Sequence, residues 1–316
     1  MIEINNLVKR YGDKTAVNDI SFTVNDDEIL GFLGPNGAGK TTTMNIITGF
    51  LSSTSGSVKV NGHDILEEPE LAKQQIGYLP ENPPLYYDMT VREYLDYVAD
   101  LKRVPKDRRK VQLDRIMSMV KITEVKNRLI GNLSKGFKQR VGIAQAMVGD
   151  PPILILDEPT VGLDPKQILE IRKLIKSLSK THSIVISSHI LSEIQEIADR
   201  VVIINHGKVA AIDTITDLGK RLSGQTKLLM TFKGSVNSCA EAVRSIPGVQ
   251  SAVPRVTDNK IGQIEINILS NQSNDVREAI FFLMAKKNWP ILEIRSLDPT
   301  LEEVFLNITA AKRRAN

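Results

Sequence analysis

Cysteine, long apolar runs and a strong excess of charge are all scarce in this sequence. The 316 residues include one cysteine, Cys239, so the chain cannot form an intramolecular disulfide, which suits a reducing compartment. We expect this side chain to be a small buried hydrophobe rather than a catalytic thiol. No apolar run approaches the roughly 20 residues that span a bilayer, and Glu3, Lys9 and Arg10 come too early for a signal peptide. If the protein works at a membrane, we expect a separate polypeptide to cross it.

The charges nearly cancel. Lysine and arginine number 41 against 37 aspartates and glutamates, which gives a net charge of +4. Much of the excess is scattered or lies in the tail 312–314, and so mild a balance does not by itself predict a nucleic-acid partner. The length is sufficient for two domains, or for one domain with an appendage.

A glycine-rich loop at residues 34–41 is the feature around which the chain is organised. It reads GPNGAGKT, which fits the phosphate-binding template G-x-x-x-x-G-K-[ST]. Residues 28–33 form an apolar run that predicts a buried strand, and residues 42–47 predict a helix. Strand, loop and helix are the context that the template requires.

The residue types in this loop suit a triphosphate. Gly34, Gly37 and Gly39 let backbone N–H groups turn inward, and the helix N-terminus adds a partial positive charge. Lys40 supplies a cation for the β- and γ-phosphates, and the hydroxyl of Thr41 is placed to ligate Mg²⁺.

Two further apolar runs end in polar side chains. Residues 153–156 are followed by Asp157 and Glu158, and residues 183–188 are followed by His189. Ligands bind at the carboxyl ends of the strands in an open α/β sheet, so we expect the acidic pair to meet the phosphates and to handle Mg²⁺ and water. A solitary histidine is more often structural than catalytic, but this is the third parallel-type strand that delivers a polar group at one edge.

The sequence pattern of residues 84–149 differs from that of the preceding part and is typical of helices. Thr90 followed by Glu93 predicts a capping box, and Ser134 is an N-cap candidate for a helix over 135–148. This serine either caps its own helix or presents a helix start to a phosphate. The segment predicts a small helical subdomain inserted in an α/β core.

The last third of the chain predicts a separate accessory domain. Residues 227–297 show the order strand, helix, strand, strand, helix, strand, which is typical of a ferredoxin-like unit, and a further helix is predicted over 301–309. We place the boundary between residues 1–222 and 223–316. No catalytic constellation occurs in the second part, so a binding, dimer-bracing or regulatory role and a passive role remain open.

Taken in order, these motifs resemble the nucleotide-binding subunit of an ABC (ATP-binding cassette) transporter over about residues 1–220. The resemblance implies a P-loop NTPase core of ABC type with antiparallel β and helical subdomains, plus a small C-terminal α+β domain. It also implies hydrolysis of ATP to ADP and phosphate, with ATP and Mg²⁺ bound.

The resemblance assigns a role to each motif. Glu158 polarises the attacking water, His189 touches the γ-phosphate, and Lys40 completes the catalytic group. Tyr11, which spacing alone explains more simply as a cap of the sheet, becomes the adenine-stacking aromatic. Residues 162–164 become the D-loop, which couples two sites across a dimer. The implied metal ligands are Thr41, Asp157 and Glu81, and the implied nucleotide contacts are Tyr11, Gly34, Pro35, Asn36, Gly37, Ala38, Gly39, Lys40, Thr41, Thr42, Ser134 and Gly136.

Two positions depart from the pattern of the family. The signature Leu-Ser-Gly-Gly-Gln reads LSKGF here, at residues 133–137. Ser134 and Gly136 are kept, so we expect a working but altered site. The glutamine usually found after Gly-Tyr-Leu-Pro is Glu81, which keeps an oxygen ligand for Mg²⁺ but loses an amide donor.

The resemblance also implies partners. Two chains would sandwich two ATP molecules, each between one chain's P-loop and the other's Ser134, as a homodimer or as a pair with a paralogous ATPase. An integral membrane permease would bind them on the cytoplasmic face of the cell membrane, and no nucleic acid is expected. Residues 77–86 and 298–305 resemble the ABC-2 exporter branch, which includes drug-export and gliding-motility members.

Two alternatives remain. A soluble ABC ATPase could act on nucleic acid or ribosomes, but chromosome-type members need a long coiled-coil insert, and 93 residues separate Lys40 from Ser134. Ribosome-type members carry two cassettes, whereas this chain has one. The altered signature and Glu81 would also suit a nucleotide-gated interaction module with negligible turnover.

Overall fold

The computed structural model describes residues 1–215, 217, 225–258, 261–269 and 276–297. The chain divides into two compact units, Met1–Ile215 and Thr216–Asn316, a few residues before the predicted boundary. Each unit is described by itself. No helix in the described ranges is long and apolar enough to span a membrane.

An antiparallel sheet opens the first unit, as the alternating pattern of the sequence indicates. Ile2, Ile4 and Leu7 of its first strand are fully or almost fully buried, while the intervening residues are more exposed. The strand order is β2-β1-β4-β5. The strands are β1 (Ile2–Tyr11), β2 (Lys14–Val24), β4 (Ser55–Val60) and β5 (His63–Asp64).

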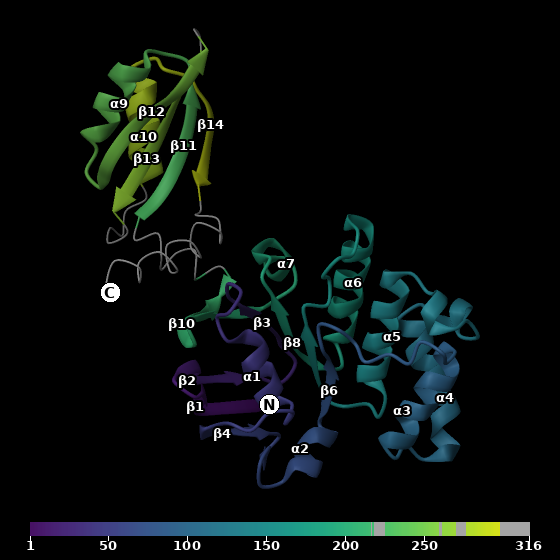
Figure 1. Cartoon of the computed structure of the whole chain (residues 1–316). Helices are drawn as coiled ribbons and strands as arrows, with labels where there is room; N and C mark the ends of the chain where they lie inside the picture. Colours follow the sequence, from purple (N-terminus) through teal and green to yellow (C-terminus); the bar gives the residue numbers. More distant parts are fainter. Residues whose placement is uncertain (216, 218–224, 259–260, 270–275, 298–316) are drawn as a thin grey trace. The chain divides into compact units, whose positions relative to one another are not determined.

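A second, six-stranded sheet has the order β10-β9-β3-β8-β7-β6 (Figure 1). Its strands are β3 (Ile29–Leu33), β6 (Ile76–Leu79), β7 (Ile153–Asp157), β8 (Ser183–Ser188), β9 (Arg200–Asn205) and β10 (Lys208–Thr214). All neighbours are parallel except β9 and β10. Every residue of β3, β7 and β8 is buried, which explains why these strands are apolar without alternation.

The register of the central strands decides which side chains lie together at one edge of the sheet. Leu33 pairs with Ser188, and Asp157 pairs with Ser187, so β3, β7 and β8 end together. The glycine-rich loop, the acidic pair and His189 therefore leave the sheet at one edge.

Helix α1 (Lys40–Ile47) joins the two sheets into one core. Its buried Met44, Ile46 and Ile47 belong to one cluster with side chains of both sheets, including Phe22 and Phe32. The other helices of this α/β part are α2 (Pro69–Gln74), α6 (Pro165–Leu178) and α7 (Leu191–Gln195). The sequence predicts a helix over residues 190–198, but α7 ends at Gln195 because the chain closes a turn there, in which the N–H of Ile197 bonds the Ile194 carbonyl.

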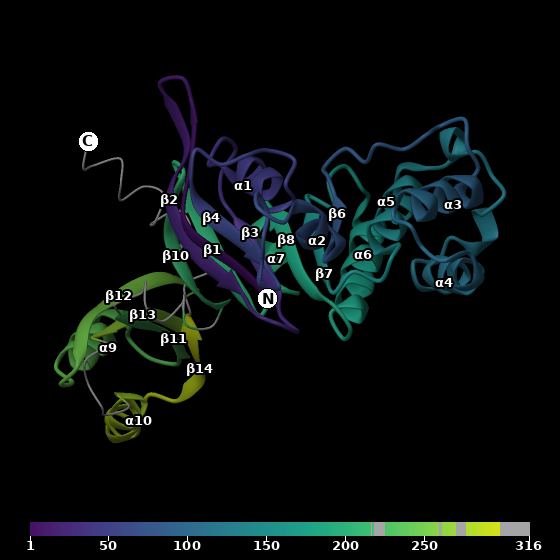
Figure 2. The same ribbon diagram turned by 90° about the horizontal axis from the view of Figure 1, so that it is seen from below.

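The predicted helical segment contains α3 (Val91–Leu101), α4 (Lys106–Met119) and α5 (Lys135–Met147). Thr90 and Glu93 form the predicted capping box. Helix α5 packs against α3 and α4 and also against β6, so it connects the helical segment to the sheet (Figures 1 and 2). Gly142 permits this contact, because a β-carbon there would lie 2.6 Å from Leu79.

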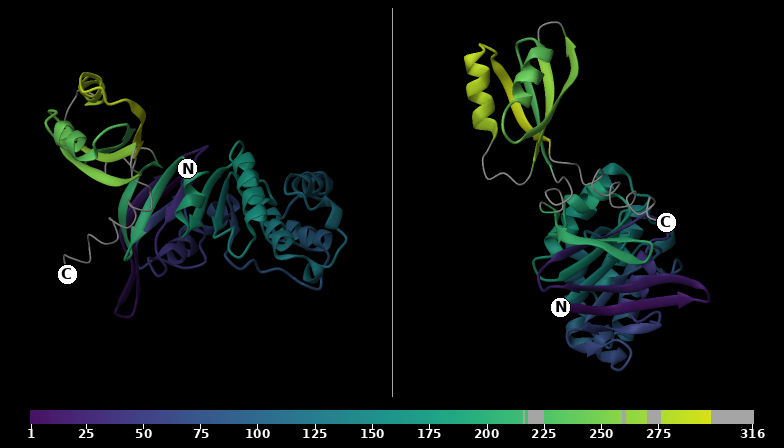
Figure 3. Two further views of the ribbon diagram at one scale, coloured as in Figure 1. Left: turned by 90° about the horizontal axis from the view of Figure 1, so that it is seen from above. Right: turned by 90° about the vertical axis from the view of Figure 1, so that its left-hand side faces the viewer.

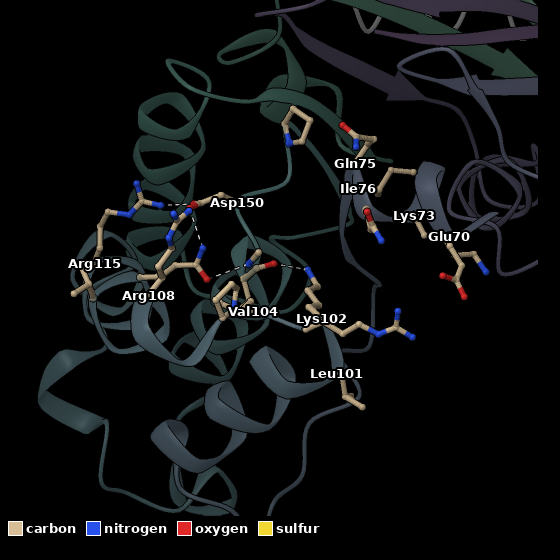
Figure 4. Close-up of a pocket in the computed structure, with 18 of the residues that line it drawn as sticks. Glu70, Lys73, Gln75, Ile76, Leu101, Lys102, Val104, Arg108, Arg115 and Asp150 are labelled. Atoms are coloured by element: carbon tan, nitrogen blue, oxygen red, sulfur yellow. Dashed lines mark hydrogen bonds and ion pairs between the residues drawn. The ribbon is translucent and has the colours of Figure 1, made fainter. Parts of the chain in front are cut away.

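An open groove of about 1270 Å³ runs between α2 and the residues around the end of α3 and the start of α4 (Figure 4). It lies where β6 and β7 begin, away from their carboxyl ends. The ammonium of Lys102 donates to the carbonyls of Val148 at 2.7 Å and Ala146 at 3.2 Å, and Arg115 pairs with Asp150. These bonds tie the end of α5 to α3 and α4.

The second unit shows the predicted strand and helix order (Figure 3). Its sheet has the order β12-β13-β11-β14 with every neighbour antiparallel, which is the ferredoxin-like arrangement. The elements are β11 (Gln225–Phe232), α9 (Val236–Arg244), β12 (Val249–Asp258), β13 (Ile261–Leu269), α10 (Val276–Lys286) and β14 (Ile291–Leu297). Cys239 is a free thiol in the core of this unit, as predicted, and the predicted helix over 301–309 lies outside the described residues.

Candidate active site

The loop between β3 and α1 has the backbone that its glycines permit. Gly37 and Gly39 have φ angles of 78° and 106°, which side-chain-bearing residues rarely adopt. A β-carbon on Gly34 would stand 2.5 Å from the Ile204 carbonyl oxygen, and one on Gly39 would stand 2.6 Å from that of Ala16. The sequence template therefore reflects both backbone conformation and close packing.

Lys40 curls back into this loop. Its ammonium is largely buried and donates to the carbonyl of Gly34 at 2.7 Å and to that of Pro35 at 3.4 Å. Burial lowers the pKa of Lys40, while Glu158 and the other nearby carboxylates oppose the shift. The Lys40 ammonium therefore lies inside the phosphate loop, with acidic side chains close enough to stabilise its charge.

Asp157 presents one oxygen without a partner. The hydroxyl of Ser187 donates to Oδ1, whereas Oδ2 is buried and makes no hydrogen bond. Burial raises the pKa of Asp157, Glu158 and Glu81 raise it further, and Ser187 and Lys40 oppose the rise. A cation at Oδ2 would relieve this accumulation of negative charge.

These residues fit Mg²⁺. Asp157 offers a bare carboxylate oxygen, and Thr41 stands at the second position of α1, beside Lys40. No cluster of three or more histidine, cysteine, aspartate or glutamate side chains that could hold a metal occurs in the described part of the chain. A magnesium ion here would thus rely on a few protein oxygens together with phosphates and water, which is its usual coordination at nucleotide sites.

Glu158 and His189 form a close pair. Oε2 of the buried glutamate lies 2.8 Å from Nδ1 of the half-exposed histidine. The N–H of Glu158 donates to the Ser187 hydroxyl at 2.9 Å, and its φ of 48° is unusual for a non-glycine residue. A carboxylate held in this way by a histidine can act as an oriented base toward water.

The structure brings Glu81 into the same group. It lies two residues after the end of β6, and its charge perturbs the pKa of Lys40, of Asp157 and of Tyr78, whose pKa is raised mainly by burial. Tyr11 lies at the end of β1, is 49% exposed, and has the Lys9 ammonium 5.3 Å from its ring centroid. Its open face is free to stack on a base, so adenine stacking stays a prediction.

Ser134 and Gly136 are not joined to the glycine-rich loop. The hydroxyl of Ser134 accepts from the N–H of Phe137 at 3.4 Å, which makes this serine the N-cap of α5. A β-carbon on Gly136 would stand 2.7 Å from Gln167, at the start of α6. No hydrogen bond or ion pair among the described residues connects this helix start with the loop 34–41.

Ser187 is a site residue that the sequence analysis missed. It bridges the side chain of Asp157 and the backbone of Glu158. The signal was a pair of hydroxyl residues, Ser187 and Ser188, closing an otherwise apolar strand. Such residues mark the point where β8 reaches the site edge.

Comparison with known proteins identifies the family. The ABC transporter model matches residues 17–161. The linearmycin resistance ATP-binding protein LnrL of Bacillus subtilis is 34% identical over 315 residues, which are 99% of this chain and 100% of LnrL. The bacitracin transport ATP-binding protein BcrA of Bacillus licheniformis is 40% identical over 223 residues, 70% of this chain and 72% of BcrA. A solved dimeric bacterial ABC transporter cassette is 25% identical with a TM-score of 0.62, over 68% of this chain and 99% of that one.

These matches confirm the predicted family, its fold and its ATPase activity, and they favour transport over the soluble alternative. The predicted exporter branch agrees with the relatives named for resistance and for transport. The chain belongs to the ATP-binding proteins of ABC transporters, and it is an ATP-hydrolysing subunit of such a transporter.

Proposed function

We propose that ATP is hydrolysed by the group at the carboxyl edge of the parallel sheet, with Glu158 as the base. The observation that carries the proposal is the Glu158–His189 pair beside the unpartnered Oδ2 of Asp157. A base, an unpartnered carboxylate oxygen that can bind a cation, and the phosphate loop all lie at one edge of the sheet. Phosphoryl transfer requires this set of groups.

The chain's own residues then have distinct tasks. Lys40 leaves the carbonyls of Gly34 and Pro35 and turns to the β- and γ-phosphates, whose charge replaces the lost hydrogen bonds. Thr41, Asp157 and Glu81 would hold Mg²⁺, which would neutralise charge on the phosphates. The remaining loop residues and Thr42 donate to the phosphates, and Tyr11 stacks on the adenine.

Glu158 accepts a proton from the attacking water as its oxygen approaches the γ-phosphorus. His189 keeps the carboxylate aimed and contacts the γ-phosphate, since its ring is half-exposed and can bridge the two. Removal of one such positioned group typically costs a factor of about 10² to 10³ in rate.

Pairing of two chains completes the site. Ser134 and Gly136 begin a helix whose N-terminus suits an anion but faces no phosphate loop within its own chain. We infer that they contact ATP held by a second copy, or by a paralogous subunit. The dimeric cassette among the similar structures supports this arrangement.

A membrane permease is the proposed partner, with the ATPase on the cytoplasmic face. Tyr86, Tyr87 and Tyr97 are exposed and follow Glu81 closely along the chain, and the rings of Tyr86 and Tyr97 are 5.5 Å apart. Exposed aromatic groups of this kind are typical of protein interfaces. Because the relatives are named for linearmycin resistance and bacitracin transport, we propose export of a toxic compound.

For the second unit, we propose the role of an accessory domain over about residues 223–316 that braces or regulates the dimer. Its exposed Phe281 and Phe282 on α10 form an aromatic pair with centroids 5.6 Å apart, which supports a contact surface.

The substitution Glu158→Gln tests the proposal. The variant should bind ATP, lose turnover and accumulate as an ATP-dependent dimer, because the amide keeps the shape of the base but not its basicity. Mg²⁺-ATPase assays and size-exclusion chromatography measure both effects, with the exposed Glu124→Gln as control. A monomer with undiminished hydrolysis would contradict the proposed site.

Purification in detergent tests the partner. An integral membrane protein that copurifies with the chain supports the transporter, whereas ribosomal or DNA-bound material alone would favour the soluble alternative.

A further inference from the structure

A buried carboxylate lies behind the catalytic pair and has none of the roles assigned above. Glu193 belongs to α7, and only 4% of its surface is exposed. Its Oε2 accepts hydrogen bonds from the hydroxyl of Thr160 at 2.6 Å and from that of Ser188 at 3.2 Å. Its Oε1 lies 3.9 Å from Nη2 of Arg172 on α6. Burial of a carboxylate is costly unless its oxygens have partners, and here both oxygens have them.

The two hydroxyls mark specific places in the chain. Thr160 comes two residues after Glu158, and Ser188 directly precedes His189. Both hydroxyl residues are buried, with 6% and 1% of their surface exposed. One carboxylate oxygen therefore joins the loop that carries the base to the end of β8, which the histidine follows.

Sheet hydrogen bonds do not provide this connection. The pairing between β7 and β8 ends at Asp157 and Ser187, before Glu158 and His189. Beyond that point, Glu158 adopts a φ of 48°, a conformation that persists only where its surroundings hold it. Glu193 supplies such a contact for the loop after β7, by bonding Thr160, and ties it to Ser188 at the end of β8, where Ser188 pairs with Leu33.

We propose that Glu193 is a positioning residue for ATP hydrolysis, which keeps the Glu158 carboxylate and the His189 ring in contact by fixing Thr160 and Ser188. This inference rests on the proposed roles of Glu158 and His189. It assigns no contact with ATP to Glu193 itself.

Arg172 extends the connection to the D-loop helix. Its Nη1 bonds Oε2 of Glu196 at 2.6 Å, so the guanidinium spans the buried Glu193 of α7 and the exposed Glu196 just after this helix. Helix α6, which carries Arg172, begins right after Asp164 of the D-loop.

Steady-state kinetics test the proposal with three variants of the full chain. Glu193→Ala and Thr160→Val should lower kcat about 10- to 100-fold and leave the KM for ATP unchanged, because they disturb alignment but no nucleotide contact. Thr160→Ser keeps the hydroxyl and should retain wild-type turnover. Glu196→Gln is the matched control, since this exposed carboxylate shares Arg172 but touches neither loop, and its kcat should not change.

A purely structural role would give a different pattern. If KM and kcat change together, or if kcat falls as far in Thr160→Ser as in Thr160→Val, the positioning role is wrong. Should Glu193→Ala not fold, Thr160→Val and Ser188→Ala carry the same test through the two hydroxyls.

A double substitution shows whether Glu193 acts through the base. In single-turnover assays, Glu193→Ala should cause no further loss in the Glu158→Gln background, because the group that it aligns is already gone. An equal loss in both backgrounds would overturn the inference and leave the proposed function intact. Undiminished hydrolysis by Glu158→Gln alone would instead overturn the proposed function.

Discussion

The side chain of Lys135, at the first position of α5, lies against the backbone of Gly162 in the D-loop. A β-carbon on Gly162 would overlap the Lys135 ammonium, and the glycine has a φ of 68°. The altered residue of the signature and the D-loop are therefore in contact within one chain. This contact gives the unusual Lys135 a physical connection to the segment that we propose couples two sites across a dimer.

Replacement of Gly162 should separate the effect of backbone strain from the effect of losing the Lys135 contact. Gly162→Ala adds a methyl group at positive φ, which costs about 1 to 2 kcal/mol of stability, and it also displaces Lys135. Gly62→Ala is the matched control, because Gly62 has a φ of 86° with nothing within 4 Å of its β-carbon position. We expect similar losses in urea unfolding but a several-fold loss of ATPase only for Gly162→Ala. Equal ATPase for the two variants would show that the Lys135 contact does not matter for turnover.

Asp157→Asn should stabilise the free protein while disabling its metal site. Because burial and Glu158 raise the pKa of Asp157 above its unfolded value, the unfolded state loses this proton first as pH rises, and the aspartate contributes less stability at neutral than at acid pH. The amide removes that cost, so the thermal midpoint without ligand should rise by a few degrees, for about 1 kcal/mol.

Addition of Mg²⁺ and ATP gives the complementary measurement. The wild-type midpoint should rise with MgATP, and this rise should be greater at higher pH, because the cation needs the ionised carboxylate, whose pKa is raised. In the Asp157→Asn variant, the portion of this rise in thermal midpoint that depends on Mg²⁺ should be lost. If that portion persists, Asp157 does not bind the metal.

Lys102 should make stability depend on pH in the alkaline range. The side chain is exposed overall, but partial burial of its ammonium, which donates to the Ala146 and Val148 carbonyls, lowers the pKa to about 8, below the unfolded value. Between pH 8 and about 10 the unfolded state therefore binds more protons at this site, and the unfolding free energy rises with pH. Urea midpoints of the wild type, relative to Lys102→Met, should increase over this window. The exposed Lys110→Met should keep the wild-type profile, and identical profiles for all three proteins would contradict the prediction.

Cys239 should react only after unfolding. The thiol is fully buried against Met284, and burial raises its pKa to about 12. We expect no alkylation by iodoacetamide at pH 8 in the folded chain and complete alkylation in urea, as measured by mass spectrometry. Rapid alkylation without urea would mean that the second unit opens readily.

Much of the fold follows from short-range patterns. The apolar runs ending at Leu33 and Leu156 predicted parallel strands buried on both faces, and the structure confirms them. The capping box at Thr90 and the order of elements in the second unit were equally local signals. The length of α7 could not be predicted from a local pattern, because the end of this helix depends on a turn at Ile197 rather than on apolar periodicity.

The sequence alone determined the chemistry available at the site: the loop 34–41, the acidic pair, His189 and the start of α5 at Ser134. Each depends on residue type and on neighbours within a few positions, which local conformation and hydrogen bonding dictate. The tertiary structure decided which groups meet. Only the register of β7 against β8 placed Ser187 on Asp157, and only packing of α7 against the loops brought Glu193 behind Glu158 and His189, because such contacts join residues that are distant in the chain.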